Sequence, residues 1–293
     1  MTIAAIDPGR HGAGTAAEAL LAAFATPGPI EAPIAIVAAH PDDETIGLGA
    51  QLRRFRRGLL VHVTDGAPAN GRDARARGFA TAQDYAAARS AELAAALVAA
   101  DAGNLRRTAF GVPDQQAWRD LAGLAGRIAE LLDAERPHAV ITHPYEGGHP
   151  DHDAAAFAVH AACRLLRSRC PPAIIEMASY HAGDAGLSCG VFLPGPGEIL
   201  EIALGRDDRA RKRRMFACFR TQEEVLAPFP IGAERFRPAP LYDFTRPPHL
   251  GALWYERLGW DVTGADWRRA AAAALTELGL DDRPSNTGGL RCR

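Results

Sequence analysis

Residues 34–44 read IAIVAAHPDDE, an apolar run that leads into a histidine and three carboxylates. The run over 34–40 contains β-branched residues and predicts a strand that is buried on both faces. Proline and acidic residues suit the first turn of a helix, which we expect from about 44 to 57. A core strand that ends in charge and leads into a helix indicates an α/β unit with polar chemistry at the end of the strand.

Further strands and helices alternate along the chain. We expect strands at 59–66, 105–111, 138–144 and 173–180, and helices at 84–100, 116–134 and 151–167. Strands joined by helical crossovers of this length predict an α/β fold, with a mainly parallel sheet and helices on both faces. Beyond residue 185 the pattern is weaker and predicts a strand at 198–204, a basic helix at 207–219 and a short helix near 266–278.

The composition limits the partners and the compartment. The 293 residues are 47% hydrophobic with a formal net charge of −2, so nothing favours nucleic acid or an anionic membrane surface as a partner. The five cysteines are odd in number and lack CxxC spacing, which indicates a reducing compartment without a disulfide framework. We find neither a secretion signal nor an apolar run of about 20 residues, and therefore expect a cytoplasmic protein without a transmembrane segment.

We expect three regions along the chain. Residues 1–30 form a peripheral segment, because three prolines and a glycine in TPGPIEAP (26–33) end a short helix. Residues 31–230 form the main domain, and residues 231–293 form an extension that packs on it, with a disordered tail over the last dozen residues. The prolines and aromatics of the extension leave a lid, a homo-oligomer interface and ordinary packing open.

A second polar cluster, THPYEGGHPDHD over 142–153, follows the strand expected at 138–144. The carboxyl ends of parallel strands meet at one edge of a sheet, so both clusters are expected at one site. Each cluster alone could be an acidic helix N-terminus. A histidine and an aspartate three apart, with a third ligand from another loop, would instead leave one position open for water, as in catalytic zinc sites. Nitrogen and oxygen ligands suit zinc, with iron, cobalt and manganese as alternatives.

The two motifs AHPDDE (39–44) and GGHPDHD (147–153) together resemble those of the PIG-L/LmbE superfamily of metal-dependent N-deacetylases. The resemblance covers roughly residues 33 to 225. It implies a Rossmann-like fold, one zinc ion per chain, and hydrolysis of the acetamide of an N-acetylated amino sugar or its conjugate. The partner would then be a small molecule.

The resemblance also implies roles for individual residues. It gives three zinc ligands, which are His40, Asp43 and His152. Asp42 matches the general base, and His149 matches the histidine that stabilises the oxyanion. Asp151 matches the carboxylate that orients this histidine.

Weaker matches suggest substrate-binding residues, which are Asp114, Arg72, Arg89, Tyr145 and Glu146. Asp114 resembles an acid that contacts sugar hydroxyls, and the alternative is an ordinary turn aspartate. Arg72 lies in a loop that often contacts substrate in the family, but a solvated loop explains it equally well. Arg89 pairs structurally or reaches substrate, and the structural role is favoured. Some members carry a tyrosine where this chain has Gly147, and Tyr145 is the nearest substitute.

Two other functions stay open from the sequence. The same metal site could serve an amidase or an ester hydrolase acting on another acylated small molecule. A non-catalytic sugar-binding domain of the same fold is less favoured, because a decayed site should have lost ligands or the base. The expected ligands and the base are all present.

Overall fold

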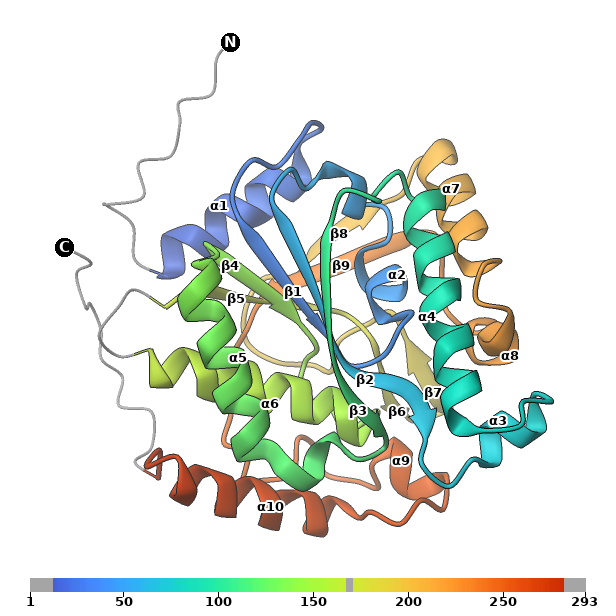
Figure 1. The fold of residues 1–293 in the computed structure, drawn as a ribbon. Helices are drawn as coiled ribbons and strands as arrows, with labels where there is room; N and C mark the ends of the chain where they lie inside the picture. The colour runs from blue at the N-terminus through green and yellow to red at the C-terminus, as the bar shows by residue number, and fades with distance from the viewer. Residues whose placement is uncertain (1–12, 167–170, 282–293) are drawn as a thin grey trace.

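The computed structural model describes residues 13–166 and 171–281, and these build a central sheet with helices on both faces (Figure 1). The sheet has seven strands in the order β3-β2-β1-β4-β5-β9-β8. Its parallel part consists of β3 (Arg106–Asp114), β2 (Gly58–Pro68), β1 (Ile34–Ala38), β4 (Ala139–Thr142) and β5 (Ala173–Met177). The predicted α/β fold with a mainly parallel sheet is confirmed.

The order in which successive strands are placed in the sheet reverses between β1 and β4. From β1, the next two strands β2 and β3 lie toward one edge of the sheet, whereas β4 and β5 lie on the other side of β1. Residue Ile36 of β1 is level with Ile141 of β4, so the two strands end at nearly the same height. Loops that follow neighbouring strands at such a switch point flank a crevice, which is the usual ligand position in open α/β sheets. Both sequence motifs lie in these two loops.

Strand β1 is buried on both faces, as its continuous apolar run predicts. Ala35 and Val37 face one core, which α5 (Leu121–Glu135), α6 (Pro150–Leu165) and α10 (Gly264–Glu277) cover. Ile34 and Ile36 face the other core, which α1 (Ala13–Ala25), α4 (Ala82–Ala99) and α7 (Arg206–Phe216) cover. The alternation follows from the two-residue period of a strand.

Two elements differ from the sequence predictions. The helix expected over 44–57 is divided into α2 (Asp43–Leu48) and a 3₁₀ turn over Leu52–Arg54, separated by residues that include Gly49. Glycine disfavours helix continuation, and Gly47 packs so tightly that a Cβ there would lie 2.4 Å from the Sδ of Met177. The strand expected over 173–180 ends at Met177, and Tyr180 instead begins a separate hairpin.

Residues beyond 230 complete the sheet. Strand β9 (Ala233–Pro238) pairs antiparallel with β5 on one side and with β8 (Leu200–Ala203) on the other. The sequence predictions contained no strand here, because AERFRP mixes charged and apolar residues and ends in proline. The expected disordered tail lies outside the described residues. Within 13–166 and 171–281, no helix is long and apolar enough to cross a bilayer.

The remaining elements are short. They are α3 (Arg72–Ala76), a 3₁₀ turn over Ala117–Asp120, β6 (Tyr180–Gly183), β7 (Gly186–Cys189), a 3₁₀ turn over Arg220–Gln222, α8 (Glu223–Leu226) and α9 (Trp254–Arg257). The β6–β7 hairpin forms a separate two-stranded sheet, and α9 and α10 lie below the carboxyl ends of the parallel strands in Figure 1.

Candidate functional site

Three side chains with metal-binding atoms converge between the loops that follow β1 and β4. The Nδ1 atom of His40 lies 3.2 Å from Oδ2 of Asp43, and the Nε2 atom of His152 lies 3.2 Å from Oδ1 of Asp43. The two histidine nitrogens are 3.3 Å apart. A tetrahedral metal ion with ligands at about 2.0–2.2 Å separates its ligand atoms by about 3.3–3.6 Å. The three side chains, all buried, could therefore hold one metal ion.

A second layer of contacts orients these three side chains. The backbone N–H of His40 donates to Oδ2 of Asp43 at 2.7 Å. The Nδ1 atom of His152 lies 3.2 Å from Oγ of Ser179, which leaves Nε2 free to face the convergence point. The ring of His143 stacks on that of His152 at 3.9 Å between centroids. Such outer contacts select the ring nitrogen that a metal can use.

The pKa values of these three groups are strongly shifted. Burial opposes ionisation of Asp43, but the neighbouring His152 and His143 hold its pKa well below the usual range. Burial lowers the pKa of His152 to about 3, so this ring is neutral. Burial also lowers the pKa of His40, yet Asp114 and the other carboxylates raise it overall. A metal ion at Nδ1 would thus displace a proton from His40.

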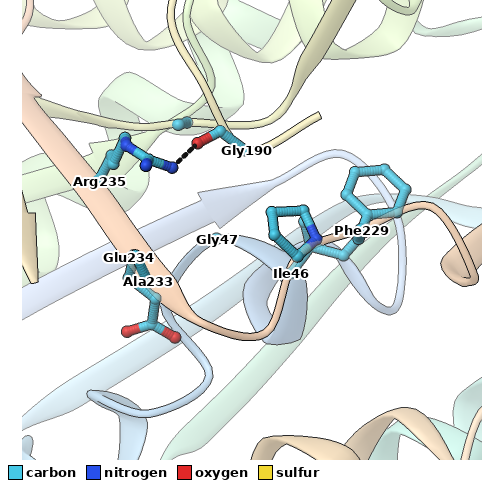
Figure 2. A pocket seen from close by; sticks show the side chains of 9 residues that line it. Ile46, Gly47, Gly190, Phe229, Ala233, Glu234 and Arg235 are labelled. Atoms are coloured by element: carbon cyan, nitrogen blue, oxygen red, sulfur yellow. Dashed lines mark hydrogen bonds between the residues drawn. The ribbon is translucent and has the colours of Figure 1, made fainter. Parts of the chain in front are cut away.

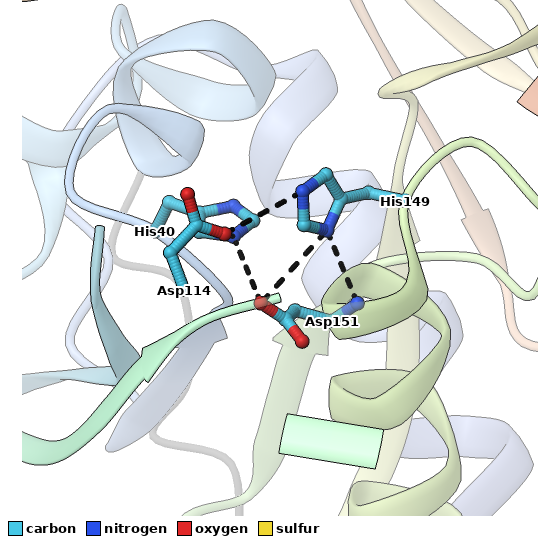
Figure 3. Close-up of side chains that lie close together, drawn as sticks. All are labelled: His40, Asp114, His149 and Asp151. Atoms are coloured by element: carbon cyan, nitrogen blue, oxygen red, sulfur yellow. Dashed lines mark hydrogen bonds and ion pairs between the residues drawn. The ribbon is translucent and has the colours of Figure 1, made fainter. Parts of the chain in front are cut away.

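The other nitrogen of His40 faces two carboxylates, as Figure 3 shows. Its Nε2 lies 3.0 Å from Oδ1 of Asp114 and 3.3 Å from Oδ2 of Asp151. These distances fit an Nε2–H that donates to both groups, so Nδ1 becomes the lone-pair nitrogen once the ring is neutral. Asp114 comes from the end of β3, and Asp151 from the first turn of α6.

His149 is the N-cap residue of α6. Its Nδ1 accepts the backbone N–H of Asp151 at 3.1 Å, so a neutral ring carries its proton on Nε2. Burial and the nearby His40 lower the pKa of His149 well below its usual range. The carboxylate of Asp151 lies 3.9 Å from Nδ1 of His149, which is longer than its distance to His40. The backbone of Asp151, rather than its side chain, therefore makes the hydrogen bond to His149.

Asp42 has an unusual backbone conformation, with φ 145°. Strain of this kind persists only where the surroundings impose it, and it is common at functional sites. The backbone N–H of Asp42 donates to Oε2 of Glu44, and the same oxygen lies 3.0 Å from Nε2 of buried His62. Arg89 donates to Oδ2 of Asp42 at 2.9 Å. Burial raises the pKa of Asp42 to about 8, although Arg89 lowers it.

The other four of the five weaker candidates fall in different surroundings. Arg89 is buried and also donates to the carbonyls of Pro41 and Gly66, which is the structural pairing that the sequence favoured. Arg72 is exposed on α3. Tyr145 donates its hydroxyl to the carbonyl of Arg246, and Glu146 accepts from Arg237 and from the backbone of Leu193. These contacts hold both side chains inside the protein, where the sequence had predicted contact with substrate.

One residue at the site was missed from the sequence. The ring of half-buried Trp260 lies 4.7 Å from that of His149, at an interplanar angle of 67°. Trp260 belongs to the extension, and no motif links it to the HPDHD stretch. Only its aromatic, proline-rich surroundings could have drawn attention to it.

Two cavities lie elsewhere. The one in Figure 2, of about 10 Å³, is lined by residues that include Gly47, Phe229 and Arg235 and has room for about one water molecule. A larger one of about 350 Å³ is lined by Ile34, Gly58 and neighbouring residues, where β1 and β2 begin. It therefore lies at the opposite end of the strands from the histidine and aspartate cluster.

Comparison with known proteins agrees with this geometry. Residues 35–163 match the PIG-L family, described as GlcNAc-PI de-N-acetylase. The chain is 37% identical over 142 residues to a 1D-myo-inositol 2-acetamido-2-deoxy-alpha-D-glucopyranoside deacetylase of Mycobacterium sp. (strain KMS). That match covers 40% of this chain and 45% of the relative, so the chain spans about half the length of the mycobacterial proteins it matches.

Two further matches are longer. A probable N-acetyl-alpha-D-glucosaminyl L-malate deacetylase 2 of Bacillus subtilis (strain 168) is 31% identical over 198 residues, covering 66% of this chain and 88% of that protein. The fold is similar to that of teicoplanin deacetylase in its zinc-inhibited form, with a TM-score of 0.53 and 19% identity, covering 70% of this chain and 97% of that one. With most of the Bacillus subtilis relative covered, the chain belongs to the PIG-L family.

Proposed function

We propose that this protein is a zinc-dependent hydrolase that removes the acetyl group from an N-acetylated amino sugar or a conjugate of one. The convergence of His40, Asp43 and His152 beside the strained Asp42 carries the proposal. The names of the Mycobacterium and Bacillus subtilis relatives describe deacetylases of two different glucosaminyl conjugates, which supports the substrate class. A cytoplasmic location is part of the same proposal.

The donor set fits zinc. Once His40 has lost its proton, the site offers two neutral imidazole nitrogens and one carboxylate, the ligand types of catalytic zinc sites, which keep a further position open. The two histidine nitrogens are 3.3 Å apart, and each lies 3.2 Å from one oxygen of the Asp43 carboxylate, which suits a small tetrahedral ion. Zinc bound there would act as a Lewis acid on the acetamide carbonyl and on a water molecule.

The protein groups divide the proton transfers. Asp42 takes a proton from the attacking water while the oxygen of that water bonds to the carbonyl carbon. The raised pKa of Asp42 suits a base that works near neutral pH. His149 donates a hydrogen bond from Nε2 to the carbonyl oxygen as negative charge develops there. The C–N bond then breaks and the amine nitrogen takes the proton held by Asp42. The second proton of the water leaves on the acetic acid, which ionises to acetate on release.

We assign supporting roles to four other candidates. Asp114, at the end of β3 and only 12% exposed in its side chain, would accept a hydrogen bond from a sugar hydroxyl. Asp151 and Arg89 act on the protein's own groups, since Asp151 orients His40 and Arg89 orients Asp42. Arg72, exposed on α3, would meet only the outer part of a conjugate.

Zinc content and amine release, measured together, test the proposal. The full chain should contain one equivalent of zinc and release amine from at least one conjugate among lipid-linked, nucleotide-linked, thiol-precursor and antibiotic-linked N-acetylglucosamines. Chelation should abolish release, and added zinc should restore it. Asp42→Asn should keep the zinc and lower kcat by about 10²–10⁴-fold, the usual contribution of general base catalysis. An Asp42→Asn variant with full activity would refute the assigned mechanism.

A further inference from the structure

The extension contacts the loop that carries His149 at points before and after that residue. The hydroxyl of Tyr145 donates to the carbonyl of Arg246 at 2.9 Å, and the backbone N–H of Trp254 donates to the carbonyl of Gly147 at 2.8 Å. After His149, the indole N–H of Trp267 donates to the carbonyl of Pro150 at 3.0 Å. Each contact spans more than 100 residues of sequence.

The glycines before His149 allow this close packing. Gly147 has φ +68°, and a Cβ there would lie 2.6 Å from Cδ2 of Leu253. A Cβ on Gly148 would lie 2.0 Å from the carbonyl oxygen of Tyr180. The extension and the β6 strand thus hold the loop from two directions, with no space for a side chain at either position.

Trp260 reaches the reaction centre from this well-anchored segment. Its ring packs on His149, and Trp260 is half-buried, so part of this residue remains accessible. The same segment holds a second half-buried tryptophan, Trp254, which lies against Arg257 instead. Aromatic walls are typical of small-molecule sites, and the C–H face of a sugar ring packs well on an indole.

We propose that Trp260 is a specificity-determining residue whose indole packs against the sugar ring of the substrate beside His149. The expected change in KM rests on the proposed function, whereas the contact between Trp260 and a sugar ring does not. It assigns one wall of the substrate site to the extension, which lies outside the stretch 35–163 that matches the family.

Substitutions that separate aromatic character from bulk test the inference in the zinc-loaded full chain. Trp260→Leu keeps an apolar side chain but removes the ring, and should raise KM for the deacetylated conjugate about tenfold with a smaller change in kcat. Trp260→Phe should restore most of the loss. Trp254→Leu makes the same change at the other half-buried tryptophan of the segment, keeps the backbone N–H that bonds to Gly147, and should leave KM unchanged. An unchanged KM in Trp260→Leu, or an equal rise in Trp254→Leu, would overturn the inference.

A binding measurement keeps the two proposals distinguishable. If the wild-type chain releases no amine from any conjugate, the proposed reaction fails, but calorimetric titration with N-acetylglucosamine still tests the sugar contact. Binding by wild type that weakens about tenfold in Trp260→Leu and recovers in Trp260→Phe would support the role of Trp260 alone. Binding that is absent in wild type, or equal in all variants, would reject it.

Discussion

Arg89→Met is the most informative perturbation outside the metal ligands. Arg89 is only 3% exposed and donates to the carboxylate of Asp42 and to the carbonyls of Pro41 and Gly66, at 2.8–2.9 Å. Methionine occupies similar volume but offers no donor. The substitution therefore leaves a buried carboxylate and two carbonyls without these bonds, while the packing around α4 stays nearly filled.

The structure sets the size and direction of two effects. Removing one partner of a buried, hydrogen-bonded ion pair costs about 3–5 kcal/mol of unfolding free energy, which lowers Tm by about 6–20 °C in a chain of this size. Arg89 also lowers the pKa of Asp42, so its loss raises that pKa. Because the base works deprotonated, the acidic limb of the kcat/KM profile should move to higher pH.

Thermal unfolding and the pH profile of amine release measure these effects. Arg107→Met makes the same change at an exposed position of β3 and should alter neither quantity. In the Asp42→Asn background, Arg89→Met should cost less stability than in wild type, because the charge it neutralises is already gone. Equal costs in the two backgrounds, together with an unmoved acidic limb, would refute the ion pair as the means by which Arg89 acts.

Two further predictions concern buried charges. Asp151→Asn should weaken zinc binding, measured by titration of the metal-free protein, about 10–100-fold, because the Asp151 side chain orients His40. An unchanged zinc affinity with a lower kcat would instead indicate that this side chain acts on His149. Lys212→Met should lower the unfolding free energy by about 3–5 kcal/mol in denaturant titrations, because it removes the cation that lies 2.8 Å from Oε1 of buried Glu234. A change below about 1 kcal/mol would contradict this.

The parallel part of the fold followed from local patterns. The apolar run of β1, the alternation with helices and the crossover lengths are short-range features, so five strands and their helices were predicted near their observed positions. Strand β9 was not predicted, because its place in the sheet depends on pairing with β5 and β8, which lie far away in sequence. Helix α2 likewise ends earlier than expected, at Leu48 before Gly49.

The sequence by itself determined which residues could meet at the edge of the sheet. His40 and Asp43 are three apart on one turn, and the strand order needed only to bring His152 to them. Tertiary structure decided which atoms pair. It placed the Asp151 side chain on His40, buried Arg89 against Asp42 and brought Trp260 to His149. These contacts join residues 47 to 111 positions apart, and no local periodicity encodes them, because they arise only when separate elements pack on one another.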